Sequence, residues 1–255
     1  MKSFSGEVKV YINNSWINVN KTQELFLGEK IKTNNGKTKI ILQGKANIYL
    51  KKNSEIEIIS LKKNNLSIKL IKGIIENIFS KTKQYSYFVK LSNSTISVKG
   101  TNFIVKNLNN EKSVFVKSGE VLFKNNLSEI LLKKYDKAKL DNNKIELVIA
   151  DKKEILPILQ NNINSIKKYK QKRLEKIEEN TLLLKIAKKT YGLSKQDIIT
   201  KLDLIDSGEI DDSLLIEKAP FKKDELREIK KINDRIKYSN SEIRYIKNKF
   251  NYSLD

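Results

Sequence analysis

Apolar residues in the N-terminal part of the chain recur at every second position, whereas those in the C-terminal part recur every three or four. Alternation of apolar and polar side chains is typical of a strand that buries one face. It is clearest in residues 8–12, 46–50, 66–70 and 85–91. Asn and Gly residues that favour turns separate these runs at short intervals. The pattern predicts an all-β domain over residues 1–148, built from short strands as a sandwich or a solenoid.

Glycines punctuate this β pattern at defined places. The run Asn34-Asn35-Gly36 predicts a tight hairpin, because Asn-Gly accepts the positive φ angles of such a turn. Gly100 interrupts a β-like run, which predicts a bend between strands at about residues 85–99 and 101–106. The pattern x-G-x-V recurs at Gly6 and Gly119, and Gly73 carries it with isoleucine in the last place, which hints at stacked layers.

Helical spacing begins near Asp151, which we expect to cap a helix that either starts near Pro157 or kinks there. Gly192 is placed as the residue that ends a second helical stretch. The sequence Ser194-Lys195-Gln196-Asp197 is typical of a new helix start with an acidic first turn. These signals predict a helical domain over residues 149–255.

The last helix carries apolar residues at intervals of seven. Additional apolar positions flank this series, so one face of the helix is expected to be buried. We favour a bundle that packs on itself, and a coiled coil that oligomerises or binds a partner is the alternative. The residues of the series are Ile229, Ile236, Ile243 and Phe250.

Residues Val98-Lys99-Gly100-Thr101-Asn102-Phe103-Ile104-Val105 resemble the V-x-G-T-x-F-x-V core of FecR-type domains. Further segments resemble the family in the same order along the chain, so the similarity covers about residues 4–140. One departure is Gln43-Gly44, where the family has Asp-Gly. The other segments are residues 26–33, 37–50, 70–75 and 114–121. The resemblance marks as structural motif positions Gly28, Thr33, Gly44, Gly73, Gly100, Thr101, Phe103 and Gly119.

The resemblance implies a periplasmic module for sensing or for binding another protein. The best-known FecR-type proteins pass the signal of an iron-uptake receptor to an extracytoplasmic-function sigma factor, which requires a membrane span and a cytoplasmic segment. No run of about 18 apolar residues occurs here, so no transmembrane segment is expected. We therefore expect an envelope scaffold that binds a protein partner, with a glycan such as peptidoglycan as the alternative ligand. The location expected is the periplasm or cell envelope after removal of a signal peptide, and a cytoplasmic copy is the alternative.

Composition restricts the chemistry that the protein can perform. The chain of 255 residues contains neither cysteine nor histidine. Disulfides, thiolate or imidazole metal ligands and nucleophile pairs that use histidine are therefore excluded. We expect a protein that is not an enzyme and has no cofactor.

The chain has a net charge of +21, which suggests a nucleic-acid-binding protein as an alternative. All but four of its 51 Lys and Arg residues are lysine, however. Proteins that read base sequence favour the planar fork of arginine. We interpret most of the charge as solvated faces of strands and helices, so binding of nucleic acid is disfavoured.

Two acidic clusters were considered as sites. Residues 203–212 would place Gly208 at the sixth position of an EF-hand loop, but Ile205 and Leu214 then stand where carboxylates are required. Glu55 and Glu57 point to one face of a strand, as paired catalytic carboxylates can. With lysines nearby, a surface salt bridge is the simpler interpretation.

Two further segments suggest ligand binding. Residues 186–192 resemble one helix of LysM glycan-binding modules, but without the strands that flank it there, so a plain bundle helix is favoured. Tyr85, Tyr87 and Phe88 lie among lysines, as in surfaces that stack bases or sugars. An alternating strand explains them equally well. Trp16 is interpreted as a core or rim anchor, with ligand stacking as the alternative.

Overall fold

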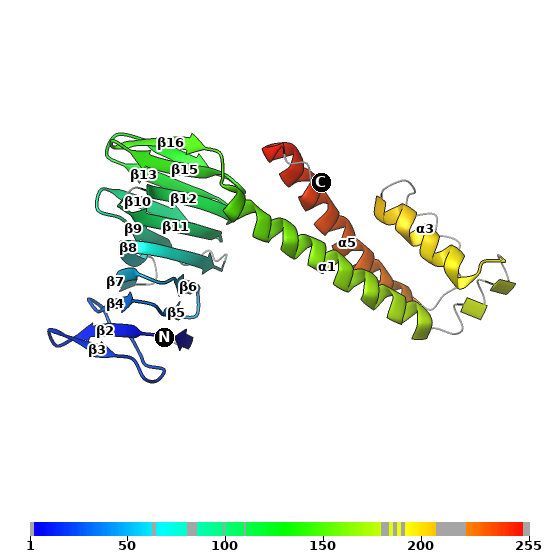
Figure 1. Ribbon diagram of the computed structural model, residues 1–255, viewed down its shortest axis with the longest axis horizontal. Helices are drawn as coiled ribbons and strands as arrows, with labels where there is room; N and C mark the ends of the chain where they lie inside the picture. The colour runs from blue at the N-terminus through cyan, green and yellow to red at the C-terminus, as the bar shows by residue number, and fades with distance from the viewer. Residues whose placement is uncertain are drawn as a thin grey trace. The chain divides into compact units, whose positions relative to one another are not determined.

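The computed structural model describes residues 3–62, 65–80, 86–98, 100–109, 111–179, 184–185, 188–189, 192–207 and 223–251. The chain divides into two compact units, Met1–Ala150 and Asp151–Asp255. The first contains the strands and the second contains the helices (Figure 1). The fold is therefore an all-β region followed by an α-helical region, as the two hydrophobic periods predict.

The β-unit contains sixteen strands among its described residues. They are β1 (Ser3–Ser5), β2 (Val8–Ile12), β3 (Ser15–Asn18), β4 (Lys30–Thr33), β5 (Lys37–Leu42), β6 (Ala46–Leu50), β7 (Ser54–Lys62), β8 (Asn65–Phe79), β9 (Tyr87–Lys90), β10 (Ser94–Val98), β11 (Asn102–Leu108), β12 (Glu111–Ser118), β13 (Val121–Asn125), β14 (Glu129–Leu132), β15 (Lys137–Asp141) and β16 (Lys144–Val148). In Figure 1 they are stacked in nearly the order of the chain, from blue to green.

These strands form two sheets that share β8. Sheet A has the order β1-β5-β6-β8-β11-β12-β15-β16, and sheet B has the order β3-β2-β4-β7-β8-β9-β10-β13-β14. All pairs are antiparallel except β8–β9, which is parallel. The first part of β8 pairs with β7 and β9, and the part after Gly73 pairs with β6 and β11. The two sheets thus form a sandwich through which one long strand passes.

One hydrophobic core fills the space between the sheets. The strands alternate between buried and more exposed positions, as in β6, where Ala46, Ile48 and Leu50 are fully buried. Buried residues from both sheets belong to a single cluster. Removal of this apolar surface from water is the main source of stability of such a domain.

Two of the predicted connections are wrong. Residues 85–99 were expected to form one strand, but β9 and β10 are separate antiparallel strands. A turn joins them, in which the Leu91 N–H donates to the Ser94 carbonyl at 2.9 Å. Residues 34–36 were expected to form a hairpin, but β4 and β5 do not pair with each other and belong to different sheets. Gly36 instead allows two backbone segments to pack closely. A Cβ on Gly36 would lie 2.6 Å from the carbonyl oxygens of Ser5 and Glu7, which lie at the connection between β1 and β2.

The helical unit contains three long helices in its described residues: α1 (Lys152–Glu179), α3 (Lys195–Ser207) and α5 (Lys223–Phe250). Asp151 precedes α1, and its N–H is bound by the Glu154 carboxylate at 3.0 Å, which is half of a capping box. Pro157 lies inside α1, so the helix starts before it. Most of residues 186–192 and residues 208–212 of the acidic cluster lie outside the described residues.

The start of α3 agrees with its sequence signals. Gly192 has a φ of +64°, and its N–H donates to the Lys188 carbonyl at 3.1 Å, as in a left-handed helix cap. Ser194 and Asp197 then form a reciprocal cap, in which the Asp197 N–H donates to Ser194 Oγ and the Ser194 N–H donates to Asp197 Oδ2. These local bonds satisfy backbone donors that the first helical turn leaves unpaired.

Candidate functional site

Several of the predicted motif residues lie where the chain passes from one sheet to the other. At Gly73, the bend in β8, φ is +98°, and an added Cβ would lie 2.2 Å from Ser54 Oγ and 2.4 Å from Ser54 Cα. Ser54 Oγ accepts a hydrogen bond from the Ile74 N–H at 2.9 Å. The buried Thr33 hydroxyl accepts from the Ser54 N–H at 3.1 Å. Thr33 and Gly73 therefore meet around Ser54 and hold adjacent crossings together.

A second group of motif residues lies at the opposite edge of the sandwich, between β10 and β11 and between β12 and β13. Gly100 and Gly119 have φ of +67° and +81°, and a Cβ on Gly119 would lie 2.6 Å from the Gly100 carbonyl oxygen. The Thr101 hydroxyl donates to the Glu120 carbonyl at 2.9 Å. Phe103 is fully buried in the core. These contacts hold together two neighbouring connections between the sheets, one at Gly100 and one at Gly119.

Gly28 and Gly44 are not part of either group. Both are exposed and have positive φ, of +83° and +67°, and a Cβ on either residue would meet no atom within 4 Å. Each therefore serves a turn through its backbone conformation alone. The glycines of the recurring pattern, Gly6, Gly73 and Gly119, lie where the chain passes from one sheet to the other. The recurrence therefore has a structural explanation and needs no ligand.

The described part of the core contains a buried polar pair that the sequence did not single out. Tyr87 donates from its hydroxyl to Asn77 Oδ1 at 2.7 Å, and both residues have 0% exposure. Burial raises the pKa of Tyr87 well above its ordinary value. The Tyr87 ring also stacks on Phe79, with the ring centroids 5.5 Å apart. Of the aromatic cluster considered above, Tyr87 is therefore a core residue, and Tyr85 lies outside the described residues.

Phe88 faces the other way and belongs to a row on the outer face of sheet B. The strand register aligns four residues across β9, β10, β13 and β14, and we call them the apolar row. Leu131 is 52% exposed, and Phe88, Ser97 and Leu122 are each half-buried. The row lies along a shallow groove of about 250 Å³, which Glu120 also lines, and Glu120 precedes Leu122 by two residues and so lies on the side of the row away from Lys124. Its members are Phe88, Ser97, Leu122 and Leu131.

Three lysines form a second row beside the apolar row. Lys90 and Lys124 each lie two residues along the strand from a member of the apolar row, and Lys69 of β8 pairs with Lys90. We call Lys69, Lys90 and Lys124 the basic row. The register pairs Lys69 with Lys90, and Thr95 stands between Lys90 and Lys124. Glu129 binds Lys124 at 3.3 Å between Oε2 and Nζ. Sequence inspection missed both rows, because their members are far apart in the chain.

Glu55 and Glu57 stand opposite lysines across the sheet. The register places Glu55 between Lys32 and Lys72, and Glu57 between Lys30 and Lys69. Opposite charges on facing strands stabilise a sheet. The two carboxylates thus form part of a surface charge ladder, in which they face lysines of the neighbouring strands.

Trp16 lies at the N-terminal end of sheet B as a half-buried rim residue. Its ring centroid is 5.2 Å from that of Tyr11, and Lys32 Nζ lies 3.8 Å from the Trp16 ring centroid. A lysine at this distance makes a favourable cation–π contact. Trp16 therefore packs as a rim residue, which is one of the two structural positions expected for it.

A carboxylate on the outer face of sheet A is held by surrounding donors. Glu111 Oε1 accepts from Ser113 Oγ at 2.7 Å and lies 3.2 Å from Nζ of the fully buried Lys137 and 3.3 Å from Lys106 Nζ. Burial raises the pKa of Glu111, but hydrogen bonds from Ser113 and Lys137 and the positive charges of Lys106 and Lys137 outweigh it. The net result lowers the pKa to about 2. Glu111 is therefore a charge partner for a buried lysine.

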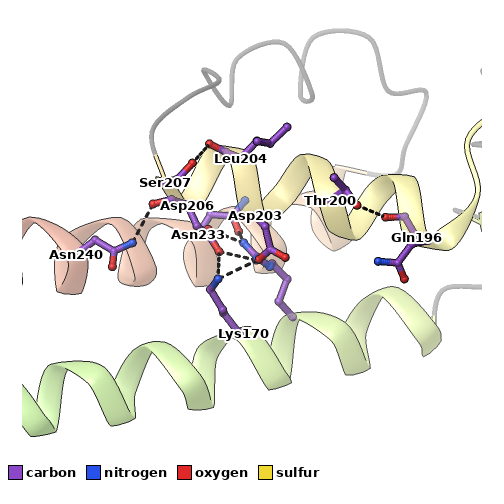
Figure 2. A network of polar contacts seen from close by, with 10 residues as sticks. Lys170, Gln196, Thr200, Asp203, Leu204, Asp206, Ser207, Asn233 and Asn240 are labelled. Atoms are coloured by element: carbon purple, nitrogen blue, oxygen red, sulfur yellow. Dashed lines mark hydrogen bonds and ion pairs between the residues drawn. The ribbon is translucent and has the colours of Figure 1, made fainter. Parts of the chain in front are cut away.

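The helical unit is held together by a buried ionic network (Figure 2). Arg173 of α1 binds Asp206 of α3 with both ends of its guanidinium, at 2.8 Å to Oδ1 and 2.7 Å to Oδ2. The same guanidinium donates to Asn233 Oδ1 of α5 at 2.9 Å. Arg173 is 3% exposed and Asp206 is 7% exposed. One arginine therefore joins all three helices.

Further contacts extend the network around α3. Lys170 Nζ lies 2.9 Å from Asp203 Oδ1 and 3.2 Å from Asp206 Oδ2. Burial lowers the pKa of Lys170, but the two carboxylates outweigh it and raise the pKa above its ordinary value. Asn240 Nδ2 and Arg244 donate to the last carbonyls of α3, those of Asp206 and Ser207, at 3.0 and 2.9 Å. Asp203 and Asp206 are thus charge partners of bundle residues.

Apolar side chains of the described helices are also buried. Ile177, Leu202 and Ile205 are buried together, with Ile198 and Ile229 packed beside them. Of the seven-residue series in α5, only Ile236 is fully buried, and Ile229, Ile243 and Phe250 are half-buried. The three helices pack on one another, as expected for a bundle.

Two features of the described residues concern metals and membranes. No group of three or more Asp and Glu side chains in them is arranged to hold a metal ion. None of the helices in the described part of the chain combines the length and hydrophobicity that a membrane span requires.

Comparison with known proteins finds a family similarity within the β-unit. Residues 29–122 match the model of the FecR protein family, which confirms the resemblance over a segment of the chain. The segment runs from the residue before β4 to the start of β13 and contains both groups of crossing residues.

Two solved structures, at 2.50 and 1.65 Å resolution, are similar to part of this chain at low sequence identity. Both are described as a "putative anti-sigma factor" from Parabacteroides distasonis ATCC 8503. Each is 15% identical to this chain, with a TM-score of 0.45 over 50% of this chain and 62% of its own length. The similarity thus spans less than two thirds of those proteins. A search of curated proteins found no match.

Proposed function

We propose that the protein is a regulatory or scaffold module of the cell envelope, without enzymatic activity, whose β-unit binds a protein partner in the periplasm. The observation that carries the proposal is the FecR match over residues 29–122, because this segment builds the central strands of both sheets. The FecR-like domain would comprise residues 1–148, and residues 149–255 would form the helical domain. The motif residues would maintain the sandwich, while its outer faces meet the partner.

The surface chemistry favours a protein over other ligands. The outer face of sheet B offers an apolar row beside lysines, which suits a partner with apolar and acidic side chains. The chain has no histidine or cysteine, so its chemistry lacks the usual general base and thiolate nucleophile. The helical domain would support docking or oligomerisation through its exposed faces.

The experiment is a chemical cross-linking pull-down of the full chain from envelope extract of the source cells. We expect one or a few protein partners to be enriched over a control protein of similar size and charge. Parallel binding to purified peptidoglycan and to DNA over a salt series tests the alternative ligands. Specific retention on DNA at moderate salt, with no enriched protein, would refute the proposal. Fractionation of the source cells tests the envelope location.

A further inference from the structure

Resting on the proposed function, we infer that the outer face of sheet B between β8 and β14 binds an amphipathic helix of the partner protein. The helix would lie across the strands, with its apolar stripe on the apolar row and acidic side chains over the basic row. This assigns both the position of the interface and the chemistry of the segment that it recognises.

The apolar row has the length of a short helical stripe. Phe88 pairs with Ser97, Ser97 with Leu122 and Leu122 with Leu131, so the row crosses four adjacent strands. Neighbouring strands lie about 4.8 Å apart, so three steps span roughly 14 Å. A helix rises about 1.5 Å per residue and would cover this length with about 10 residues. Ser97, the small residue within the row, leaves room for a side chain of the partner between its larger neighbours.

The basic row lies beside the apolar row at a distance that one helix can span. Lys90 and Lys124 are two residues along their strands from Phe88 and Leu122, which corresponds to about 6.7 Å. A helix with side chains is about 10 Å wide, so its apolar face and one flank can reach both rows. The partner is therefore expected to carry Asp or Glu on that flank.

The charges of the basic row are only partly balanced within the sheet, because Glu57 faces Lys69 on β7 and Glu129 pairs with Lys124. Lys69 and Lys90 stand directly opposite each other on β8 and β9, and like charges in this arrangement destabilise a sheet. Both are exposed, and Lys90 has no acidic residue opposite it, since Thr95 stands on its other side. An acidic partner would remove this repulsion, which is why charge complementarity favours it over a basic or neutral helix.

The first test uses synthetic helical peptides of about 12 residues and the full chain. One peptide carries a leucine stripe and a glutamate flank, and its matched control carries lysine at the glutamate positions. We expect the acidic peptide to bind, measured by fluorescence anisotropy at low salt, and Leu131→Asp to weaken it about tenfold. The control variant Leu147→Asp, at a similarly exposed leucine on β16 of sheet A, is expected to leave binding unchanged.

Charge reversal gives a second readout that a folding defect cannot imitate. Lys90→Glu should weaken the acidic peptide about threefold and strengthen the lysine peptide, whereas Lys139→Glu on β15 of sheet A should do neither. Equal binding of both peptides to all variants would overturn the inference, as would no binding of the acidic peptide.

The third test uses the natural partner. A photo-reactive amino acid at Ser97, compared with one at Leu147, is cross-linked in cells, and the captured segment is sequenced by mass spectrometry. An amphipathic helix with an acidic flank captured only at Ser97 supports the inference. Capture of a second copy of this chain, of a basic segment, or of a partner through position 147 alone overturns it. In the last case a protein partner still exists, so the proposed function stands while this inference fails.

Discussion

The bend of β8 at Gly73 provides the sharpest test of how the motif glycines act. In Gly73→Ala, the added Cβ would lie 2.4 Å from Ser54 Cα and 2.2 Å from Ser54 Oγ. Contacts under 3.0 Å are essentially never observed, so the strands must separate by about 0.6 Å or more. The left-handed conformation costs an alanine about 1–2 kcal/mol, and the overlap adds about 1–3 kcal/mol. We expect the free energy of unfolding to fall by about 2–5 kcal/mol in total.

Gly28→Ala is the matched control for this prediction. Gly28 also has a positive φ, of +83°, but a Cβ there would meet no atom within 4 Å. It should therefore show only the conformational cost of about 1–2 kcal/mol. Ser54→Ala should not rescue Gly73→Ala, because the closest backbone atom, Ser54 Cα, remains in place.

The assay is urea unfolding of the full chain followed by tryptophan fluorescence. Trp16, the single tryptophan of the chain, lies in β3 and therefore reports on the β-unit. The midpoint shift at constant slope gives the change in free energy. A cost for Gly73→Ala no larger than that for Gly28→Ala would refute the role of close backbone approach at this crossing.

Three further predictions concern buried polar groups. Tyr87→Phe should lower the free energy of unfolding by about 1–3 kcal/mol, because Asn77 Oδ1 loses its buried donor. The double variant Tyr87→Phe/Asn77→Leu should recover most of the lost stability in the same urea assay. If the double variant recovered none, the proposed cost of the unpaired Asn77 oxygen would be wrong. Because the folded-state pKa of Glu111 lies below its ordinary value, its contribution is complete above about pH 4.5 and is lost as the pH falls through about 2. The stability difference from Glu111→Gln should therefore grow between pH 2 and 5 and then level off, and a difference independent of pH would contradict this. Asp206→Ala should destabilise the helical unit by about 3–5 kcal/mol, since Arg173 stays buried without its carboxylate. Arg173→Met/Asp206→Leu should restore most of the thermal stability seen by far-ultraviolet circular dichroism, and equal midpoints for the single variant and the original chain would disprove the role of the pair.

Local signals were sufficient for the elements but not for how the strands connect. The alternation in β6 and the capping residues Ser194 and Asp197 depend on neighbours in the chain, so they are readable from it. The Asn34-Gly36 run carries the same local signal for a hairpin and for a sheet crossing. Contact between Gly36 and the crossing at Gly6, far away in the chain, decided between them.

The candidate surface was beyond the reach of sequence inspection. Phe88 and Leu131 are separated by many residues, and the turn at residues 92–93, which sets the pairing of β9 with β10, was not recognised. A shift of one residue in any of these strands would turn its side chains to the opposite face. The apolar row therefore exists only in the observed register.

The sequence by itself determined which parts of the chain become strands and helices, which faces they bury and which kinds of chemistry they lack. These properties follow from the spacing of apolar residues and from residue types, and both act over a few positions. Tertiary structure alone decided that Gly73 meets Ser54, that Arg173 meets Asp206, and which side chains align on the outer faces. Such contacts join residues distant in the chain, and their energies depend on burial and register that no local pattern records.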